Sequence, residues 1–429
     1  MIKTVEPATG LQGTIALPAD KSIAQRSALF ALLSPETSSI TNYPLAEDPR
    51  TALSCVRRLG ADVVDDGEMI RITGTGRDGI RVPEEAIDCG NSGTVMRLLA
   101  GILAGAGVPA VLTGDDSLSR RPMKRIIDPL SRMGADIQSA GGGLPPLGIT
   151  REGPFRPIQF RLPVASAQLK SCVLLAGLFG DEPTRVEEPV ATRNHTELML
   201  DLPVVRTDGT NVITSSRRQS IPPQNLNIPG DFSAAAFWLV AGTIVPQSDI
   251  ILPATGVNPT RCAALHILRR MGADIEEERE QQTGKEPAVR LRVRSSQLKP
   301  VRIHPEEIPN AIDELPVLCV AMAFADGVSR ISGAEELRYK ESDRLDAIQK
   351  ILEAAGVRVE GHPDGLTIYG EPGRKVRGAR HDSRHDHRIA MAAAILSLMG
   401  GSASEIDNAE AASVSYPEFW SHLDSLAHR

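Results

Sequence analysis

The sequence predicts an α/β (α+β repeat) fold of two domains, each built from three repeated units around buried parallel helices. Three observations predict it: the length of the chain, a recurring Gly-Ala-Asp pattern and six apolar segments at regular intervals. At 429 residues the chain is too long for one hydrophobic core. Six units would average about 71 residues, too few for six independent domains. Two domains of three units each are therefore the economical arrangement.

The Gly-Ala-Asp pattern marks an internal repeat. "RRLGADV" (57–63), "SRMGADI" (131–137) and "RRMGADI" (269–275) are near copies, and "EAAGVRV" (353–359) is a looser fourth. Each copy follows an amphipathic segment of helical period and precedes short strand-like runs punctuated by Gly, such as "GEMIRITGTG" (67–76). Self-similarity of this kind indicates repeated supersecondary units.

Six Ala/Leu-rich segments, each opening with a polar residue, form the second and stronger pattern. They open at Ser22, Asn91, Ser166, Asp231, Asp313 and Asp386, at intervals of 65 to 82 residues. These polar residues are of the types that cap helix N-termini. The segments are apolar on nearly every face, which indicates helices buried inside a domain. The Pro-rich stretch "IPPQNLNIPGD" (221–231) is the predicted linker between the domains.

Composition excludes several classes of protein. A net charge of -7 and an aromatic content of 3% argue against a nucleic-acid binder, so anion recognition must be local. The five cysteines show no paired spacing, which favours reduced, partly buried thiols over disulfides or a zinc site. The N-terminus lacks a signal-peptide core, and no uncharged apolar run approaches the ~18 residues of a membrane span. We therefore expect a cytoplasmic protein without a membrane partner.

Cations and hydrogen-bonding residues gather at the predicted helix starts. A helix N-terminus carries unpaired N–H groups and a partial positive charge, which suit an anion. The residues at these starts are Lys21, Ser22 and Arg26; Asn91, Gly93, Thr94 and Arg97; Ser166, Gln168 and Lys170; and Asp386, His387 and Arg388. If the three helices of a domain run in parallel, their N-termini face one cleft. The pattern thus predicts a cleft that binds several anionic groups.

Four charged features leave alternatives open. "DSLSRRPMKR" (116–125) and "YKESDRLD" (339–346) each carry several cations, and each taken alone is typical of a solvated surface. Asp313 is either a structural cap of the fifth helix or an acid–base group. The three histidines of "HDSRHDHR" (381–388) suggest metal ligands, but the interleaved arginines disfavour a cation, and we predict no metal.

Seven motifs together resemble a known family. "DKS…R", "GNSGT..R", "SLSRRPM", "SAQLKS", "TRNHTE", "LRYKESDR" and "DHRIAM", in this order and at this spacing, are similar to the 5-enolpyruvylshikimate-3-phosphate synthases, a family of enolpyruvyl transferases. The resemblance runs from about residue 10 to about residue 420 and implies the enolpyruvyl transferase fold. It implies three βαβαββ units per domain, with residues 19–229 as the shikimate-3-phosphate domain. Residues 1–18 and 230–429 form the second domain, which holds the catalytic carboxylates.

The resemblance also implies a reaction. Phosphoenolpyruvate donates its enolpyruvyl group to the 5-hydroxyl of shikimate-3-phosphate, and phosphate is released, on the route to chorismate and aromatic amino acids. Both substrates carry a carboxylate and a phosphate, which explains local cations on an acidic protein. No metal or organic cofactor is required, no nucleic acid is involved, and the family expectation is a monomer whose domains close over the substrates.

Residue roles follow from the resemblance motif by motif. The implied shikimate-3-phosphate contacts are Lys21, Ser22, Arg26, Ser166, Ala167, Gln168 and Arg193, and Lys21 would also contact phosphoenolpyruvate. Gly93 and Arg121 would hold the phosphate of phosphoenolpyruvate, and Arg344 and Arg388 its carboxylate. Asn91, Thr94 and His387 complete the implied binding set. Glu341 would donate a proton to the methylene carbon, and Asp313 would assist the 5-hydroxyl with Lys340 or Lys21, although such roles are easily exchanged within a coupled cluster.

The chain departs from the family pattern in two places. Val414 stands where many relatives carry Lys, and Glu336 where some carry Asn. Three motifs are like those of the branch tolerant to glyphosate, whereas Gly93 is usual in sensitive enzymes, which leaves inhibitor sensitivity open. One alternative is a UDP-N-acetylglucosamine enolpyruvyl transferase, but that family has Asn in place of Ser22 and a reactive Cys near residues 112–120 that is absent here. The other is an enzyme like RNA 3′-phosphate cyclase.

Overall fold

The chain divides into two compact units in the computed structural model, which describes residues 1–44, 46–280 and 284–428. Among these, unit 1 comprises residues 1–18, 229–280 and 287–428, and unit 2 comprises residues 19–228 and 284–286. Each unit has its own hydrophobic core. We propose that the units correspond to the predicted domains, 1–18 with 230–429 and 19–229. No helix in the described ranges is both long and apolar enough to span a membrane.

Unit 2 contains three four-stranded sheets, each with one parallel and two antiparallel pairings. In sheet order the strands are β14 (Leu226–Asn227), β3 (Thr37–Thr41), β5 (Met69–Thr73) and β4 (Asp62–Asp65); β6 (Ile87–Asp88), β7 (Ala110–Thr113), β9 (Leu144–Thr150) and β8 (Asp136–Ala140); and β10 (Gln159–Arg161), β11 (Thr184–Glu188), β13 (Thr210–Ser215) and β12 (Val204–Thr207). The helices are α1 (Lys21–Leu33), α2 (Glu47–Arg58), α3 (Gly93–Ala106), η1 (Leu118–Arg120), α4 (Lys124–Arg132), α5 (Ala167–Gly177) and α6 (His195–Leu200).

Unit 1 also contains three sheets. Their strands are β16 (Asp274–Arg279), β17 (Ala288–Arg294), β15 (Asp249–Gly256), β2 (Gly10–Thr14) and β24 (Ala427–His428); β18 (Arg302–Ile303), β19 (Gly327–Ile331), β21 (Gly365–Gly370) and β20 (Arg358–His362); and β1 (Ile2–Val5), β23 (Ser404–Asp407) and β22 (Arg380–Asp382). The helices are α7 (Phe232–Ile244), α8 (Ala263–Arg270), α9 (Ile308–Ala311), α10 (Leu315–Ala323), η2 (Glu335–Tyr339), α11 (Arg344–Ala354), α12 (His387–Ser397), η3 (Ala409–Val414) and α13 (Phe419–Leu426).

A repeated order of elements underlies both units. Between β6 and β9 the main elements follow the order strand, helix, strand, helix, strand, strand, and the same order recurs between β18 and β21. Two repeats take their first strand from a distant part of the chain, because β14 pairs in parallel with β3 and β2 in parallel with β15. The predicted mixed α/β fold with repeated small sheets is confirmed.

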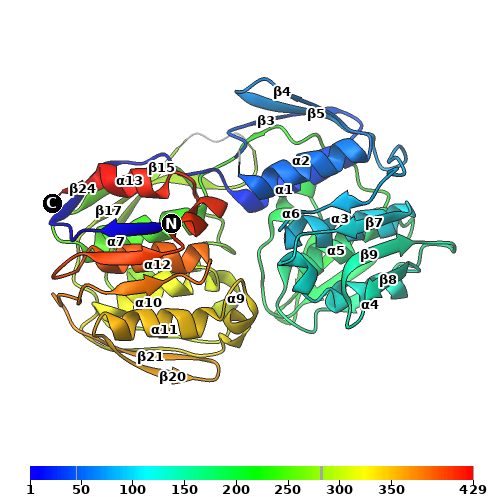
Figure 1. The fold of residues 1–429 in the computed structure, drawn as a ribbon. Coiled ribbons are helices and arrows are strands. Elements are labelled where there is room, and N and C mark those ends of the chain that lie inside the picture. The colour runs from blue at the N-terminus through cyan, green and yellow to red at the C-terminus, as the bar shows by residue number, and fades with distance from the viewer. Residues whose placement is uncertain (45, 281–283, 429) are drawn as a thin grey trace. The chain divides into compact units, whose positions relative to one another are not determined.

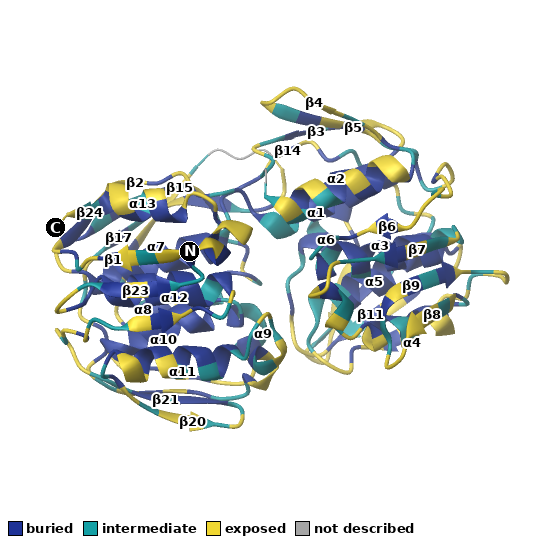
Figure 2. Cartoon of the chain, in the orientation of Figure 1, coloured by how far each residue is buried: buried dark blue, intermediate teal, exposed yellow. Residues whose placement is uncertain are grey.

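The six predicted apolar segments form the buried helices α1, α3, α5, α7, α10 and α12. Helices α7 and α10 are buried at every residue, whereas α2 exposes one face (Figure 2). In unit 1, α7, α10 and α12 pack against one another (Figure 1). All-round burial explains why these segments show no polar face in the sequence. The five cysteines are buried free thiols, as predicted.

Three of the six predicted helix caps are wrong by one or two residues. Ser166, Asp231 and Asp386 do cap their helices. Helix α1, however, is capped by Asp20, which accepts from the Ile23 amide at 2.9 Å, and α3 by Ser92. The cap of α1 thus lies two residues before the predicted Ser22, and the cap of α3 lies one residue after the predicted Asn91.

The fifth helix differs more. α10 begins at Leu315, with Glu314 at the N-cap position and no side-chain cap bond. Asp313 is therefore not a cap, and its carboxylate lies near cations instead. This settles the open alternative at Asp313 against the structural cap.

The chain passes between the two units at more places than the predicted linker, residues 221–231. The amide of Asp231 donates to the carbonyl of Pro18 at 2.8 Å, so two crossing segments are hydrogen bonded. Residues 284–286, between β16 and β17, pack with unit 2: Glu286 Oε1 lies 2.7 Å from His195 Nδ1, and Lys285 pairs with Asp201. A short segment between two strands reads as an ordinary turn, which explains why the sequence did not predict this crossing.

The stability of the protein is expected to fall as the pH drops from about 6.5 toward 4. Burial lowers the pKa of His381 from 6.5 to about 4, because its ring on β22 is 2% exposed. The unfolded chain therefore takes up a proton in this window before the folded protein does, which costs about 3 kcal/mol at most. Urea denaturation at pH 7, 6 and 5 should show a shallower loss for His381→Gln than for the unchanged protein. Equal slopes for both would contradict burial of a neutral imidazole.

Candidate active site

The N-termini of the three buried helices of unit 2 are joined by side chains. Gln25 Nε2 of α1 donates to Ser92 Oγ, the cap of α3, at 3.0 Å. Gln168 of α5 connects to α3 twice: its Oε1 accepts from Arg97 Nη1 at 2.5 Å, and its Nε2 donates to Thr94 Oγ1 at 2.9 Å. The helix starts therefore converge, and their unpaired N–H groups gather in one region.

Two arginines reinforce this positive region. Arg26 is 3% exposed and donates to Thr196 Oγ1 at 3.2 Å and to the carbonyl of Ser22 at 3.1 Å. Burial, and next the charge of Arg193, lower the pKa of Arg26 to about 10, so it stays protonated at neutral pH. Two mutually repelling cations beside the starts of α1 and α5, where Ser166 and Ala167 lie, favour an anion.

Lys21 opens α1 and is partly exposed. Its Nζ lies 3.1 Å from Asp48 Oδ2 of α2, and 30% of its side chain is exposed. The sequence analysis did not identify Asp48, because the residue belongs to the amphipathic helix rather than to a helix start. An ammonium on a flexible stem, held by one carboxylate, remains available to a ligand.

Arg121 is fixed by the loop that precedes α3. Its Nη2 donates to Asn91 Oδ1 at 2.7 Å and to Ser117 Oγ at 3.1 Å, and Asn91 Nδ2 donates to Asp115 at 2.7 Å. A Cβ on Gly93 would lie 2.8 Å from Arg97 Nη1 and 3.6 Å from Arg121 Nη1. The missing side chain at Gly93 thus leaves the loop backbone open beside two guanidinium groups.

In unit 1 three cations surround the carboxylate of Asp313. Its Oδ1 lies 3.7 Å from Lys340 Nζ and 3.5 Å from Arg344 Nη1, and its Oδ2 lies 3.9 Å from Arg388 Nη2. Glu341 pairs with Arg344 Nη2 at 2.6 Å and is 34% exposed. Two carboxylates among three cations form a group suited to proton transfer and to binding anions.

Arg344 is the most buried member of this group, at 1% exposure. It binds Asp386 through two bonds, Nε to Oδ2 at 2.8 Å and Nη2 to Oδ1 at 3.3 Å. Burial alone would lower the pKa of Arg344, but the charges of Glu341 and Asp386 raise it above its usual value. Burial would likewise raise the pKa of Asp386, yet Arg344 and His387 hold it below its usual value. Both groups are charged at neutral pH.

His387 starts α12 and is 5% exposed. Burial, followed by the neighbouring charge of Arg388, lowers the pKa of His387 to about 4, so its imidazole is neutral near pH 7. It can therefore contribute a hydrogen bond to a ligand but no charge. Among the residues that the structure describes, no group of three His, Cys, Asp or Glu side chains is arranged to hold a metal ion.

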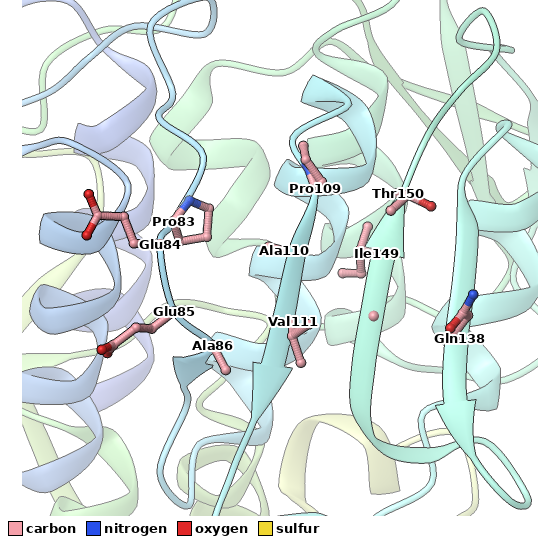
Figure 3. Close-up of a pocket in the computed structure, with 11 residues that line it drawn as sticks. Pro83, Glu84, Glu85, Ala86, Pro109, Ala110, Val111, Gln138, Ile149 and Thr150 are labelled. Carbon is pink, nitrogen blue, oxygen red and sulfur yellow. The ribbon is translucent and has the colours of Figure 1, made fainter.

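A groove of about 430 Å³ lies elsewhere in unit 2, along β7, β8, β9 and the segment 83–86 that precedes β6 (Figure 3). Glu84 and Glu85 stand at one side of it, and Val111 and Ile149 line its apolar part. None of the predicted site residues lines this groove. Its carboxylates disfavour anionic substrates, so the converging helix starts are the better candidate site.

Comparison with known proteins identifies the family. The family model for EPSP synthase (3-phosphoshikimate 1-carboxyvinyltransferase) matches residues 5–423. The chain belongs to the EPSP synthase family. It is 47% identical over 429 residues to a 3-phosphoshikimate 1-carboxyvinyltransferase of Salinibacter ruber, covering 100% of both chains.

Solved structures agree with this assignment. EPSP synthase of Acinetobacter baumannii superimposes with a TM-score of 0.88 at 36% identity, covering 99% of this chain and 98% of that one. The enolpyruvyl transferase NikO of Streptomyces tendae, at 17% identity and a TM-score of 0.78, covers 99% and 97% and shares the fold. The predicted family, fold and activity are confirmed: the chain is an EPSP synthase of the shikimate pathway, and the family implies phosphoenolpyruvate and shikimate-3-phosphate as substrates.

Sequence reasoning missed a second set of residues around the candidate site. Three side chains contact predicted site residues without having been singled out: Asp48, Ser233 and Glu314. Arg261 contacts Ser233 and Glu314 in turn. Asp231 had been identified only as a helix cap. The one available signal was position, because Ser233 and Glu314 each lie next to the start of a buried helix.

Proposed function

We propose that unit 2 of this EPSP synthase binds shikimate-3-phosphate at the converging starts of α1, α3 and α5. The observation that supports this is the presence of two neighbouring cations, buried Arg26 and Arg193, beside those starts. The proposed contacts are Lys21, Ser22, Arg26, Ser166, Ala167, Gln168 and Arg193. Hydroxyl and amide groups suit the ring hydroxyls, and the cations suit the carboxylate and the phosphate.

Two sets of contacts are proposed for phosphoenolpyruvate. Its phosphate binds Arg121 and the open backbone at Gly93, with Asn91 and Thr94 nearby. Its carboxylate binds Arg344 and Arg388, whose planar guanidinium groups can hold a carboxylate by two parallel hydrogen bonds. His387 adds an uncharged contact.

The proposed chemistry is addition followed by elimination. Glu341 protonates the methylene carbon, C2 becomes cation-like, and the 5-hydroxyl attacks C2 as its proton passes to Asp313, assisted by Lys340 or Lys21. Phosphate then leaves the resulting ketal with the electron pair of its C–O bond, and the new methyl group returns a proton to Glu341, which restores the carbon–carbon double bond. Arg344, 2.6 Å from Glu341, favours the charged form of that carboxyl group. When the substrate carboxylate occupies Arg344, this pairing weakens, and Glu341 can take up the proton that it donates.

Removing one cation from each binding set tests the assignment. Arg193→Ala should raise KM for shikimate-3-phosphate, and Arg121→Ala KM for phosphoenolpyruvate, each by about 10- to 100-fold, the range expected for a hydrogen bond to a charged group. The KM for the other substrate should change less than about threefold in each variant. Steady-state kinetics with one substrate varied at a time measures both values. The assignment would be contradicted if either variant raised the KM for both substrates equally. It would also be contradicted if Arg193→Ala raised mainly the KM for phosphoenolpyruvate and Arg121→Ala mainly that for shikimate-3-phosphate.

Oligomeric state and location stay predictions. A monomer of 46.0 kDa is expected by size-exclusion chromatography with light scattering. The cytoplasm is the expected location.

A further inference from the structure

Arg388 is held in place by two hydrogen bonds. Its Nη1 donates to the backbone carbonyl of Asp313 at 2.9 Å, and its Nη2 donates to Ser233 Oγ at 3.1 Å. The two acceptors belong to different helix starts, those of α10 and α7. The direction of the guanidinium plane therefore depends on where Ser233 places its oxygen.

The Ser233 hydroxyl has no freedom left. It accepts from Arg388 Nη2 and from Arg261 Nη2, and arginine can only donate. Its own proton must then go to Glu314 Oε1, 2.5 Å away. A hydroxyl offers one donor and two acceptor positions, and all three are used.

Glu314 anchors this arrangement from a fully buried position. Its Oε1 also accepts from Arg261 Nη1 at 2.8 Å and lies 3.7 Å from Arg388 Nη1. Its side chain is 0% exposed, and that of Arg261 is 4% exposed. The buried carboxylate of Glu314 thus lies between the guanidinium groups of Arg261 and Arg388. It is closer to Arg261 than to Arg388, so the charge of Arg388 remains available to a ligand.

We propose that Glu314 is a positioning residue for Arg388 and acts through Ser233 and Arg261. This inference rests on the proposed role of Arg388 as a contact of the phosphoenolpyruvate carboxylate. Without the charge of Glu314, the Ser233 proton loses a charged acceptor, and Arg261 loses its carboxylate partner at 2.8 Å and keeps the longer pair with Asp231 at 3.4 Å. Arg388 then leaves the plane in which it can bind a carboxylate by two bonds.

The test is steady-state kinetics of Glu314→Gln, Ser233→Ala, the double variant and Arg388→Lys. Glu314→Gln and Ser233→Ala are each expected to raise KM for phosphoenolpyruvate about 10-fold and to leave KM for shikimate-3-phosphate within about twofold. The double variant should be no worse than the more affected single variant, since both changes break one chain of contacts. A matched control is Glu307→Gln, which breaks the surface pair with Arg270 in the same unit and should change neither KM.

The outcomes separate this inference from the proposed function. If Arg388→Lys raises KM for phosphoenolpyruvate but Glu314→Gln and Ser233→Ala do not, the positioning role is wrong and the substrate contact stands. If both variants raise the two KM values alike, or their effects add, Glu314 has only a structural role and the inference is overturned. If Arg388→Lys leaves KM for phosphoenolpyruvate unchanged, the proposed contact fails, and the inference fails with it. Should Glu314→Gln not fold, Ser233→Ala decides by the same criteria.

Discussion

Replacement of Glu341 by Gln is expected to lower kcat about a thousandfold, within the range that general acid catalysis contributes. Gln keeps the shape of the side chain and a hydrogen-bonding oxygen for Arg344, but it cannot deliver a proton to carbon. Glu341 is 34% exposed, so its loss should change the unfolding midpoint little. The phosphate released per unit time at saturating substrates measures kcat.

A second readout makes the role of Glu341 specific. In heavy water the unchanged enzyme should transfer deuterium to the methylene carbon of phosphoenolpyruvate during turnover. In Glu341→Gln the rate of this deuterium transfer should fall to the lowered rate of phosphate release. Glu335→Gln is a suitable control, because Glu335 is an exposed carboxylate in the adjacent η2 helix. A kcat within tenfold of the unchanged enzyme would show that Glu341 is not the acid.

Arg344→Met is expected to cost about 3–5 kcal/mol of unfolding free energy at pH 7, because breaking a buried ion pair leaves an uncompensated charge. Arg344 is 1% exposed and pairs with Asp386, which is 0% exposed, and with Glu341. Met fills a similar volume, so the loss comes mainly from the charge left on Asp386. Urea denaturation monitored by circular dichroism measures the difference.

The pH dependence of this loss checks its cause. In the unchanged protein the pKa of Asp386 is lowered, so its contribution is present above about pH 3.8 and is lost as the pH falls below that. In Arg344→Met, burial without a charged partner raises the pKa of Asp386. Its carboxylate then takes up a proton at lower pH, which removes the cost of a buried unpaired charge. The deficit should therefore be smaller at pH 5 than at pH 7. The control Arg270→Met breaks an exposed ion pair and should cost at most about 1 kcal/mol of unfolding free energy at either pH. A loss for Arg344→Met that is larger at pH 5 than at pH 7 would contradict this explanation.

The buried helices were predictable from the sequence, whereas their first residues were only partly so. All-round burial of α7 and α10 produces uninterrupted apolar runs, and runs of that length and kind are typical of helices enclosed in a core. The caps of α1 and α3 were misplaced because Asp20 and Ser92 compete with Ser22 and Asn91 within two residues. The choice between such neighbours depends on backbone dihedral angles, which one sequence does not reveal.

The site was predictable only where charge accumulates at helix starts. Arg26 and Arg388 were proposed in this way, although their individual roles came from the family resemblance, and Arg121 was proposed from that resemblance alone. The network of Glu314, Ser233 and Arg261 was not predictable, because Arg261 lies far along the chain from α10 and α12 and meets Glu314 only through the packing of unit 1. The crossing at 284–286 was missed for the same reason, since the pairing of Glu286 with His195 spans 91 residues.

The most direct test of the central claim is phosphate release from phosphoenolpyruvate with two alternative acceptors. Phosphate release is expected with shikimate-3-phosphate and not with UDP-N-acetylglucosamine. Release with the nucleotide sugar, or no release with shikimate-3-phosphate from protein shown to be folded, would contradict it.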